Sequence, residues 1–452
     1  MYHSSIENIR KLYSTEEVRM KFKKILAVVL AAVTVFGVAA CGSNNAPAGD
    51  NNQAGGDNTI TIWAWDENFN IRALNEAAAI FNETHPEVTV NIVNMAQDDV
   101  ISSLNINLAA GTTDGLPNIV LIEDYRARNF LDSFLGEFAD LSDIASPEDF
   151  AAYKSAISTV GDGFYSIPFD SGVAALFYRL DLIEAAGFTE ADMQDLTWER
   201  YVEIGKAVKD ATGVDMMTMD PSDLGPIRMM LQSAGSWYTD ENGNVNIENN
   251  QALKDAFNTF KTVINADITR PITGWDQFVG GFNDGLVASV ITGCWIAPSI
   301  RNAEDQAGNW RIASFPRMGS NPNSVNASAL GGSSWYVLAN VPGQDLAKQF
   351  LQETFASNVD LMNTLAKEIN LVSTLNAAEN APNYAEQFDF FGGQKIFQLF
   401  AEWTGNIPSV DFGNHTYQIE DMMTEAFQRF MNGEDLDSLL REYQQQAEMA
   451  IR

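Results

Sequence analysis

Aromatic and acidic side chains stand together at the ends of segments that have the pattern of β-strands. Trp65 and Asp66 close the first such segment, and Asp124 and Tyr125 follow a later one. Aromatic rings pack on the C–H faces of sugars, and carboxylates hold hydroxyl groups in fixed directions, so this pairing suits carbohydrate recognition. Open α/β sheets bind their ligands at the carboxyl ends of the strands. We therefore expect these four side chains to contact a ligand, and Trp63 to be buried.

Further candidates lie where glycine or proline interrupts an extended run, or where tryptophan follows an apolar strand. Asp170 stands between Pro168 and Gly172, and Trp295 follows the apolar run at 287–291. Glycine in such a place lets the backbone approach a ligand closely. The remaining candidate contacts are Gly332, Ser333, Trp335, Trp237 and Trp403.

Each candidate also has a purely structural interpretation. Glu123 and Asp124 suit the cap of a helix, Asp170 suits a turn, and Gly332 suits an unstrained hinge. Tryptophan is equally suited to a protein core, which is the place we expect for Trp198 in a regular amphipathic helix.

The sequence lacks two motifs that are typical of nucleophilic and zinc-dependent enzymes. No Gly-x-Ser-x-Gly or His-Glu-x-x-His motif occurs, and His3, His85 and His415 are far apart. Two carboxylates in a sugar cleft are also the catalytic groups of a glycan-cleaving enzyme, so an exported enzyme of that kind stays as an alternative. We expect no catalytic residue, no metal ion and no cofactor.

The elements that position the first candidates alternate between strand and helix. Residues 59–65, 88–93 and 118–122 are apolar and rich in β-branched side chains, whereas 72–81 and 100–109 repeat apolar residues at helical spacing. Strand–helix–strand alternation of this kind predicts an α/β fold with a parallel sheet covered on both faces.

Three extended stretches interrupted by proline or glycine predict crossings between two lobes. They surround Gly172 (165–179), Gly331 (329–338) and Pro408. Crossings of this kind make each lobe discontinuous and place a cleft at the hinge. The predicted N-terminal lobe comprises residues 58–169 plus 334–403, and the predicted C-terminal lobe comprises residues 170–333 plus 404–452.

The composition is strongly acidic, with 60 Asp and Glu against 27 Lys and Arg and a formal net charge of −33. Such a chain repels polyanions, so we expect no nucleic-acid partner. Carboxylates and aromatic walls also suit a polyamine or another cation, which stays as an alternative ligand. Cys294 is the one cysteine besides Cys41, and we interpret it as a small buried apolar side chain.

The N-terminal region has the pattern of an export signal. Basic residues precede an uncharged apolar run at 25–40, which is short of the roughly 20 residues of a membrane-spanning helix. Small residues then lead to Cys41, as in a bacterial lipobox, and we expect its thiol to carry a diacylglyceryl anchor. Residues 1–40 are therefore predicted to be a signal peptide, with Met20 as the true start of translation.

After Cys41, residues up to 57 are small or polar, with no bulky apolar side chain. Such a segment buries too little apolar surface to fold, so residues 41–57 are predicted to be a flexible tether.

Six short motifs carry a family resemblance across nearly the whole mature chain. They are Ile-Trp-Ala-Trp-Asp at 62–66, Leu-Pro-Asn-Ile-Val-Leu-Ile-Glu-Asp-Tyr at 116–125, Ile-Pro-Phe-Asp-Ser-Gly at 167–172, Thr-Trp-Glu-Arg-Tyr at 197–201, Thr-Gly-Cys-Trp-Ile at 292–296 and Gly-Gly-Ser-Ser-Trp at 331–335. In this order they resemble the family-1 extracellular solute-binding proteins, which include maltose- and lactose-type binding lipoproteins. The resemblance implies the type II periplasmic-binding-protein-like fold, with two α/β lobes that close on a ligand.

The same resemblance implies a role and a location. It implies a lipid-anchored monomer on the extracytoplasmic face of the cell membrane, which captures an oligosaccharide and delivers it to the permease subunits of an ABC importer. It assigns Asp124 and Tyr125 to ligand contact and Trp295 to stacking on a sugar ring. Maltose-type members end their first strand with smaller polar residues than Trp65, so the resemblance leaves the sugar open. A surface lipoprotein without a small ligand is a further alternative.

Overall fold

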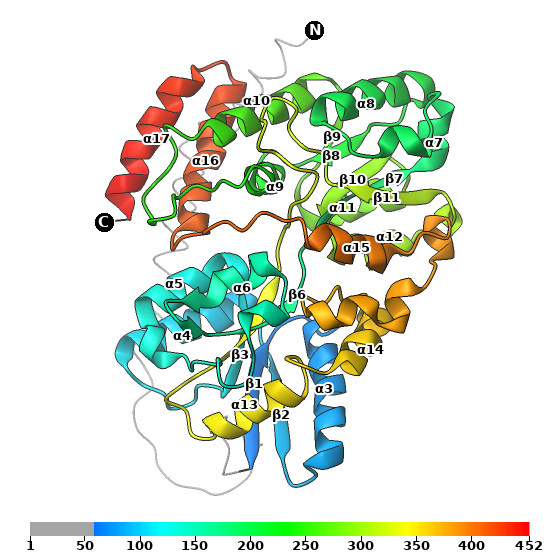
Figure 1. Ribbon diagram of the computed structural model, residues 1–452. Coiled ribbons are helices and arrows are strands. Elements are labelled where there is room, and N and C mark those ends of the chain that lie inside the picture. Colours follow the sequence, from blue (N-terminus) through cyan, green and yellow to red (C-terminus); the bar gives the residue numbers. More distant parts are fainter. Residues whose placement is uncertain (1–57, 452) are drawn as a thin grey trace, which may run out of the picture. The chain divides into compact units, whose positions relative to one another are not determined.

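The computed structural model describes residues 58–451 (Figure 1). The predicted signal peptide at 1–40, the predicted lipidation site Cys41 and the predicted tether at 41–57 lie outside the described residues. Within the described range, no helix combines the length and the apolar composition that crossing a membrane requires.

The β-branched runs near the N-terminus form a five-stranded sheet with two strands from later in the chain. Its strands are β1 (Thr59–Ala64), β2 (Thr89–Asn94), β3 (Ile119–Glu123), β6 (Ile167–Asp170) and β12 (Ser333–Val337), in the order β2-β1-β3-β12-β6. β1 runs parallel to β2 and β3, as predicted, whereas β12 runs antiparallel to β3 and β6. The sheet is therefore mixed, because β12, which follows the strands of the second lobe in the chain, inserts between β3 and β6 in the opposite direction.

Helices cover both faces of this first sheet, since alternate residues of β3 enter different apolar cores. Val120 and Ile122 pack into one core, and Ile119 and Leu121 into the other. The helices of this lobe are α3 (Asn70–Thr84), α4 (Gln97–Ala110), α5 (Asp124–Phe134), α6 (Ala152–Ser158), α13 (Gln344–Glu353) and α14 (Val359–Ile369). A short hairpin, β4 (Thr159–Val160) with β5 (Gly163–Phe164), follows α6.

A second sheet forms the centre of the other lobe. Strands β7 (Ala174–Arg179), β10 (Ser289–Gly293) and β11 (Trp310–Ser314) pair in the antiparallel order β10-β7-β11. The parallel pair β8 (Met217–Met219) and β9 (Thr269–Pro271) lies beside β10, because Ser289 N donates to Met216 O at 2.8 Å.

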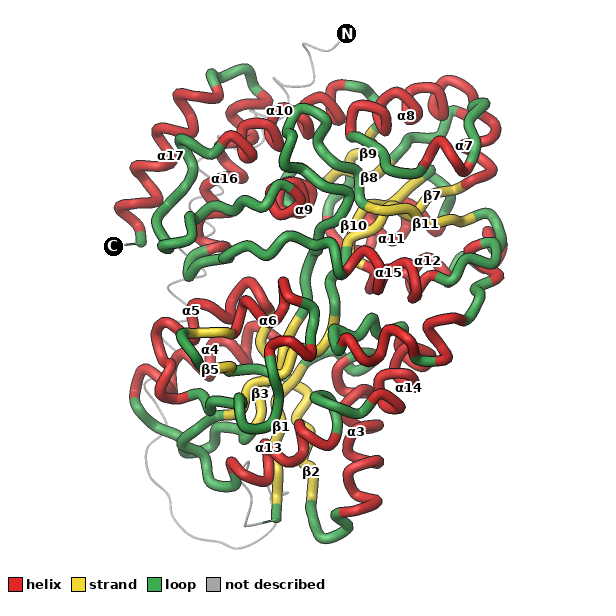
Figure 2. Tube along the Cα trace, in the orientation of Figure 1, coloured by secondary structure: helices red, strands yellow, loops and turns green. Residues whose placement is uncertain are grey.

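The helices of the second lobe surround this sheet, as Figures 1 and 2 show. They are α7 (Leu180–Ala185), α8 (Trp198–Thr212), α9 (Gly225–Ser233), α10 (Gln251–Asn265), α11 (Gly274–Asn283), α12 (Ala297–Arg301), α15 (Ile396–Thr404), α16 (Thr416–Met431) and α17 (Leu436–Ala450). Trp198 of α8 is fully buried, as the sequence predicted, and Cys294 is buried at 3% exposure.

Two of the predicted crossings, at 165–179 and 329–338, lie side by side. Leu330 N donates to the carbonyl oxygen of Gly172 at 2.7 Å. A Cβ at position 172 would lie 2.6 Å from the carbonyl oxygen of Gly331. Because the two backbones approach this closely, position 172 requires glycine.

A third segment beside these crossings lies earlier in the chain than predicted. Ser171 N donates to Val372 O at 2.8 Å, whereas α15, which precedes Pro408, packs Phe400 against Phe177 of the second sheet with ring centroids 6.2 Å apart. We infer that the third crossing runs through residues 370–375. The predicted lobe boundaries stay a prediction, and these contacts favour moving the break at 403 to this segment.

Candidate ligand-binding site

A cavity of about 440 Å³ lies between the end of β3, the crossing at 330–331 and helices α9, α11 and α16. Its wall includes Glu123, Tyr125, Arg228, Trp275, Trp295 and Tyr417. Small-molecule sites usually have volumes of about 300–1,000 Å³ and mix apolar walls with a few polar groups. The cavity therefore has the size and the lining of a site for a small organic ligand.

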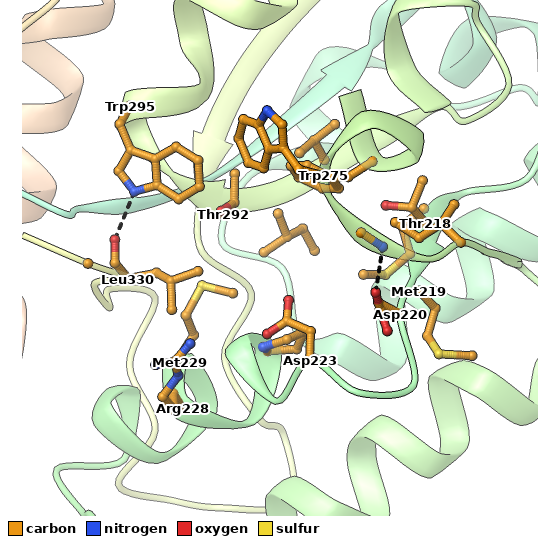
Figure 3. Close-up of a pocket in the computed structure, with 18 of the residues that line it drawn as sticks. Thr218, Met219, Asp220, Asp223, Arg228, Met229, Trp275, Thr292, Trp295 and Leu330 are labelled. Carbon is orange, nitrogen blue, oxygen red and sulfur yellow. Dashed lines mark hydrogen bonds between the residues drawn. The ribbon is translucent and has the colours of Figure 1, made fainter. Parts of the chain in front are cut away.

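Trp295 forms part of an apolar edge of the cavity, directly after strand β10. Its indole Nε1 donates to the carbonyl oxygen of Leu330 at 2.9 Å, which ties the ring to the second crossing (Figure 3). A Cβ at Gly293 would collide with the indole, so glycine at this position leaves the space that the ring occupies.

Trp275 continues this edge from the first turn of α11. Its side chain is 54% exposed, and its ring centroid lies 6.0 Å from that of Trp295 with an angle of 35° between the planes. The turn that carries it is fixed to the residue that follows β8, because Gly274 N donates to Asp220 Oδ2 at 2.9 Å. Gly274 has φ of +75°, a conformation that glycine adopts without strain.

Polar side chains from both lobes face this aromatic edge across the cavity, and Figure 3 shows Arg228 and Asp223 opposite the two indoles. Arg228 Nε lies 3.1 Å from Glu420 Oε2. The hydroxyl of Tyr417 lies 2.7 Å from both carboxylate oxygens of Glu123 and donates to them. This contact joins α16 to the end of β3.

Burial changes the proton affinity of the two carboxyl groups in this network. Desolvation raises the pKa of Glu123, against the lowering effects of the Tyr417 hydrogen bond and of the Arg228 charge. Desolvation also raises the pKa of Glu420 to about 7, although the Arg228 charge opposes the shift. The cavity therefore has a neighbouring carboxyl group that changes its charge near neutral pH.

Of the residues predicted from the sequence, Tyr125 and Trp295 lie in the cavity wall. The hydroxyl of Tyr125 accepts a hydrogen bond from Gly331 N at 3.3 Å. Trp237 stacks behind Tyr125, with ring centroids 5.6 Å apart, and its Nε1 donates to Thr416 Oγ1 at 3.0 Å. Trp237 therefore supports the wall from behind.

The polar groups of the predicted residues at the hinge have partners within the protein. Asp124 forms a buried ion pair with Lys154, whose Nζ lies 2.6 Å from Oδ2. Asp170 accepts hydrogen bonds from the backbone N and the hydroxyl of Ser333 at 2.8 and 2.6 Å. Gly332 has φ of +106°, and a Cβ there would lie 2.6 Å from Asp124 Oδ2. These groups position the junction of β3, β6 and β12.

The other predicted residues lie outside the cavity wall. Trp65 is half-buried and Asp66 is exposed in the turn before α3. Trp335 is fully buried in the core beside Phe169, at 5.2 Å between centroids, and Trp403 packs on the core of the second lobe. Trp63 is 6% exposed, as predicted for a buried residue.

Sequence reasoning missed Trp275, Arg228, Tyr417 and Glu420. Trp275 stands directly after Thr-Gly at the start of a helix, but its exposure, which is unusual for a tryptophan, is known only from the structure. The other three lie on helices with ordinary amphipathic patterns. In the part of the chain that the structure describes, no cluster of three or more His, Cys, Asp or Glu side chains has the arrangement of a metal site.

The fold and the cavity together define a two-lobed α/β binding protein. The model of the family described as bacterial extracellular solute-binding protein matches residues 76–392. The chain is 42% identical over 388 residues to a lactose-binding protein of Rhizobium radiobacter, with 86% of this chain and 92% of that protein covered. It is 24% identical to an arabinooligosaccharide-binding protein of Halalkalibacterium halodurans, with 77% and 79% covered. The chain belongs to the bacterial extracellular solute-binding protein family.

Solved structures confirm the predicted type II two-lobed fold. The sugar-binding protein MalE from Xanthomonas citri matches with a TM-score of 0.71 at 18% identity, covering 86% of this chain and 96% of that one. The galacto-N-biose-/lacto-N-biose I-binding protein of Bifidobacterium longum matches with a TM-score of 0.68 at 20% identity, covering 88% and 97%.

Proposed function

We propose that this chain captures a disaccharide or short oligosaccharide outside the cytoplasm and delivers it to the permease of an ABC importer. One observation carries the ligand class: a cavity for a small molecule has two indoles on one edge and carboxylate, guanidinium and phenol groups on the other. Indoles suit the C–H faces of sugar rings, and the polar groups suit their hydroxyls. The 42% identical relative is named for lactose, which supports a neutral sugar as ligand.

The proposed mechanism is capture followed by closure of the lobes. Glu123 and Tyr125 come from the first lobe, and Arg228 and Trp295 come from the second, so a ligand in the cavity contacts both. A ligand shifts the equilibrium between open and closed forms by its difference in affinity for them. This mechanism involves no covalent step and no cofactor. In it the chain acts as a monomer, and the permease subunits recognise it.

Calorimetric titration of a soluble chain that begins after Cys41 tests the ligand class. The panel contains lactose, maltose, longer oligosaccharides and polyamines, each at low and high salt. We expect saturable binding of one sugar with little dependence on salt. Binding of a polyamine alone, weakening steeply as salt rises, would overturn the carbohydrate proposal in favour of a cation.

Replacing Trp295 with alanine should weaken sugar binding by about 2 kcal/mol, roughly 30-fold in Kd, because the ligand loses the apolar surface of an indole. Calorimetry measures the loss, and thermal unfolding checks that the variant folds. Trp403→Ala removes a tryptophan outside the cavity and should leave Kd unchanged. Equal losses in both variants, or no loss in Trp295→Ala, would remove Trp295 from the site.

We also propose that Cys41 carries the lipid that holds the protein at the membrane. Cys41→Ala, expressed as the full chain in bacterial cells, should no longer incorporate labelled fatty acid and should leave the membrane fraction. Cys294→Ala is the matched control and should keep both the label and the location. A Cys41→Ala protein that stays labelled in the membrane would contradict the anchor.

A further inference from the structure

Trp275 is an exposed aromatic side chain in a position that protein stability does not explain. Among the described residues, the large apolar side chains that remain exposed are Ile106, Trp275, Leu286, Val325 and Met449. Trp275 is the aromatic member of this group, and it lies in the cavity wall. Leaving an indole 54% exposed forgoes the free energy of burying its apolar surface, which a ligand that covers the ring would recover.

The two indoles are too close together to hold one sugar ring between them. A sandwich needs about 7–8 Å between the indoles, twice the optimum carbon–carbon contact of about 3.5–4 Å. The centroids of Trp275 and Trp295 are 6.0 Å apart and their planes meet at 35°. Figure 3 shows the two indoles side by side and not face to face. They are therefore neighbours on one angled surface, and their spacing is similar to that between two joined pyranose rings.

Both indoles are held in place by the second lobe and its crossing. Trp275 packs against Phe278, with centroids 5.5 Å apart, and its turn is tied to Asp220 through Gly274 N. Trp295 is tied to Leu330 O. Their relative orientation is thus set by the protein before a ligand arrives, which lowers the entropy cost of binding.

We propose that Trp275 and Trp295 form a platform with a place for one sugar ring on each indole, so that Trp275 selects ligands with at least two rings. The inference rests on the proposed function, because it names a second subsite within the same cavity. Asp220 also lines the cavity, and its hydrogen bond from Gly274 N gives it a positioning role for the turn that carries Trp275.

The test compares two-ring and one-ring sugars on the same variants. The probe is whichever of lactose and maltose binds more tightly to the wild type, together with its constituent monosaccharides. Calorimetry gives Kd for the disaccharide, and displacement by monosaccharides at millimolar concentration extends the comparison to weak binding. Trp275→Ala should weaken the disaccharide about tenfold and change the Kd of the more tightly bound monosaccharide by less than about twofold.

Three further variants separate a binding role from a structural one. Trp275→Phe keeps an aromatic face and should recover part of the loss. Asp220→Asn should reproduce part of the loss, again for the disaccharide more than for the monosaccharide. Ile106→Ala removes an exposed apolar side chain of α4, outside the cavity wall, and should leave both constants unchanged.

The outcomes distinguish this inference from the proposed function. Equal losses for disaccharide and monosaccharide in Trp275→Ala, or no loss for the disaccharide, would overturn the two-ring platform while sugar binding itself stands. A wild-type protein that binds neither lactose, maltose nor their monosaccharides would overturn the platform for these sugars. If it also binds none of the longer oligosaccharides, the proposed function fails as well.

Discussion

Replacing Lys154 with methionine is expected to lower the free energy of unfolding by about 3–5 kcal/mol at neutral pH. Lys154 is fully buried, and Asp124 is 1% exposed. Nζ of Lys154 donates to both carboxylate oxygens of Asp124 at 2.8 and 2.6 Å, and to the carbonyl oxygen of Ser333 at 2.9 Å. Methionine keeps most of the volume but removes the charge, so Asp124 is left buried without its counter-ion.

The cost of this substitution should depend on pH. Desolvation raises the pKa of Asp124 in the wild type to about 6, with the Lys154 charge opposing the shift. Without Lys154 the pKa of Asp124 rises further, so the folded variant binds a proton more strongly than the unfolded chain does. Below about pH 6 Asp124 is protonated in both folded proteins, so stability of the variant falls relative to the wild type as pH rises through about 6, where Asp124 of the folded wild type ionises. Chemical denaturation at a series of pH values measures this difference.

Two further variants isolate the buried charge as the cause. Arg72 and Glu368 form an exposed pair, with side chains 48% and 40% accessible, so Arg72→Met should cost less than about 1 kcal/mol. The double variant Lys154→Met with Asp124→Leu should recover most of the lost stability, because it removes the unpaired carboxylate. Equal costs for Lys154→Met and Arg72→Met would contradict the prediction.

The free energy of unfolding of Glu420→Gln, taken relative to the wild type, should rise by roughly 3 kcal/mol between pH 4.5 and pH 7. Burial raises the pKa of Glu420 to about 7 from its ordinary value of 4.5. The folded wild type therefore binds more protons than the unfolded chain in this range, and the contribution of Glu420 to stability falls as pH rises. Glutamine does not titrate, so the variant should gain stability relative to the wild type over the same range.

The groups that surround Glu420 set the size of this effect. Arg228 lowers the pKa of Glu420, whereas Asp223, Asp421 and Glu123 raise it. The aromatic groups beside this network are Tyr125, Tyr238 and Tyr417.

Unfolding of the wild type and Glu420→Gln at pH values from 4 to 8 measures the effect. Glu425→Gln, an exposed carboxyl on the same helix, is the control and should stay within about 0.5 kcal/mol of the wild type throughout. A stability difference between the wild type and Glu420→Gln that does not change with pH would contradict a raised pKa.

Sequence patterns predicted two residues of the cavity wall, and their place at the ends of strands explains why. Tyr125 and Trp295 each follow a strand within three residues, and the carboxyl ends of strands in open α/β sheets border the ligand site. The same rule selected Asp124, but the structure gives this carboxylate a buried partner, Lys154, that lies 30 residues away in sequence. No local pattern identifies such a partner.

Trp335 is a residue for which the sequence suggested a ligand contact and the structure shows a place in the core. Its place near the crossing glycines suggested a ligand contact, yet β12 lies inside the sheet between β3 and β6. Trp335 and Tyr336 point to opposite faces, and each enters a different core. Because helices cover both faces of this sheet, neither side chain of this pair is left at a surface.

By itself, the sequence determined the alternation of strands and helices, the two-lobed fold through its ordered motifs, and the burial of Trp63, Trp198 and Cys294. These features depend on short-range periodicity and on motif order along the chain. Only the tertiary structure decided which acids face the cavity and which are paired, and it alone brought Trp275 beside Trp295 and Glu123 beside Tyr417. Those contacts join residues that are distant in sequence, so their geometry depends on how the sheets, crossings and helices pack.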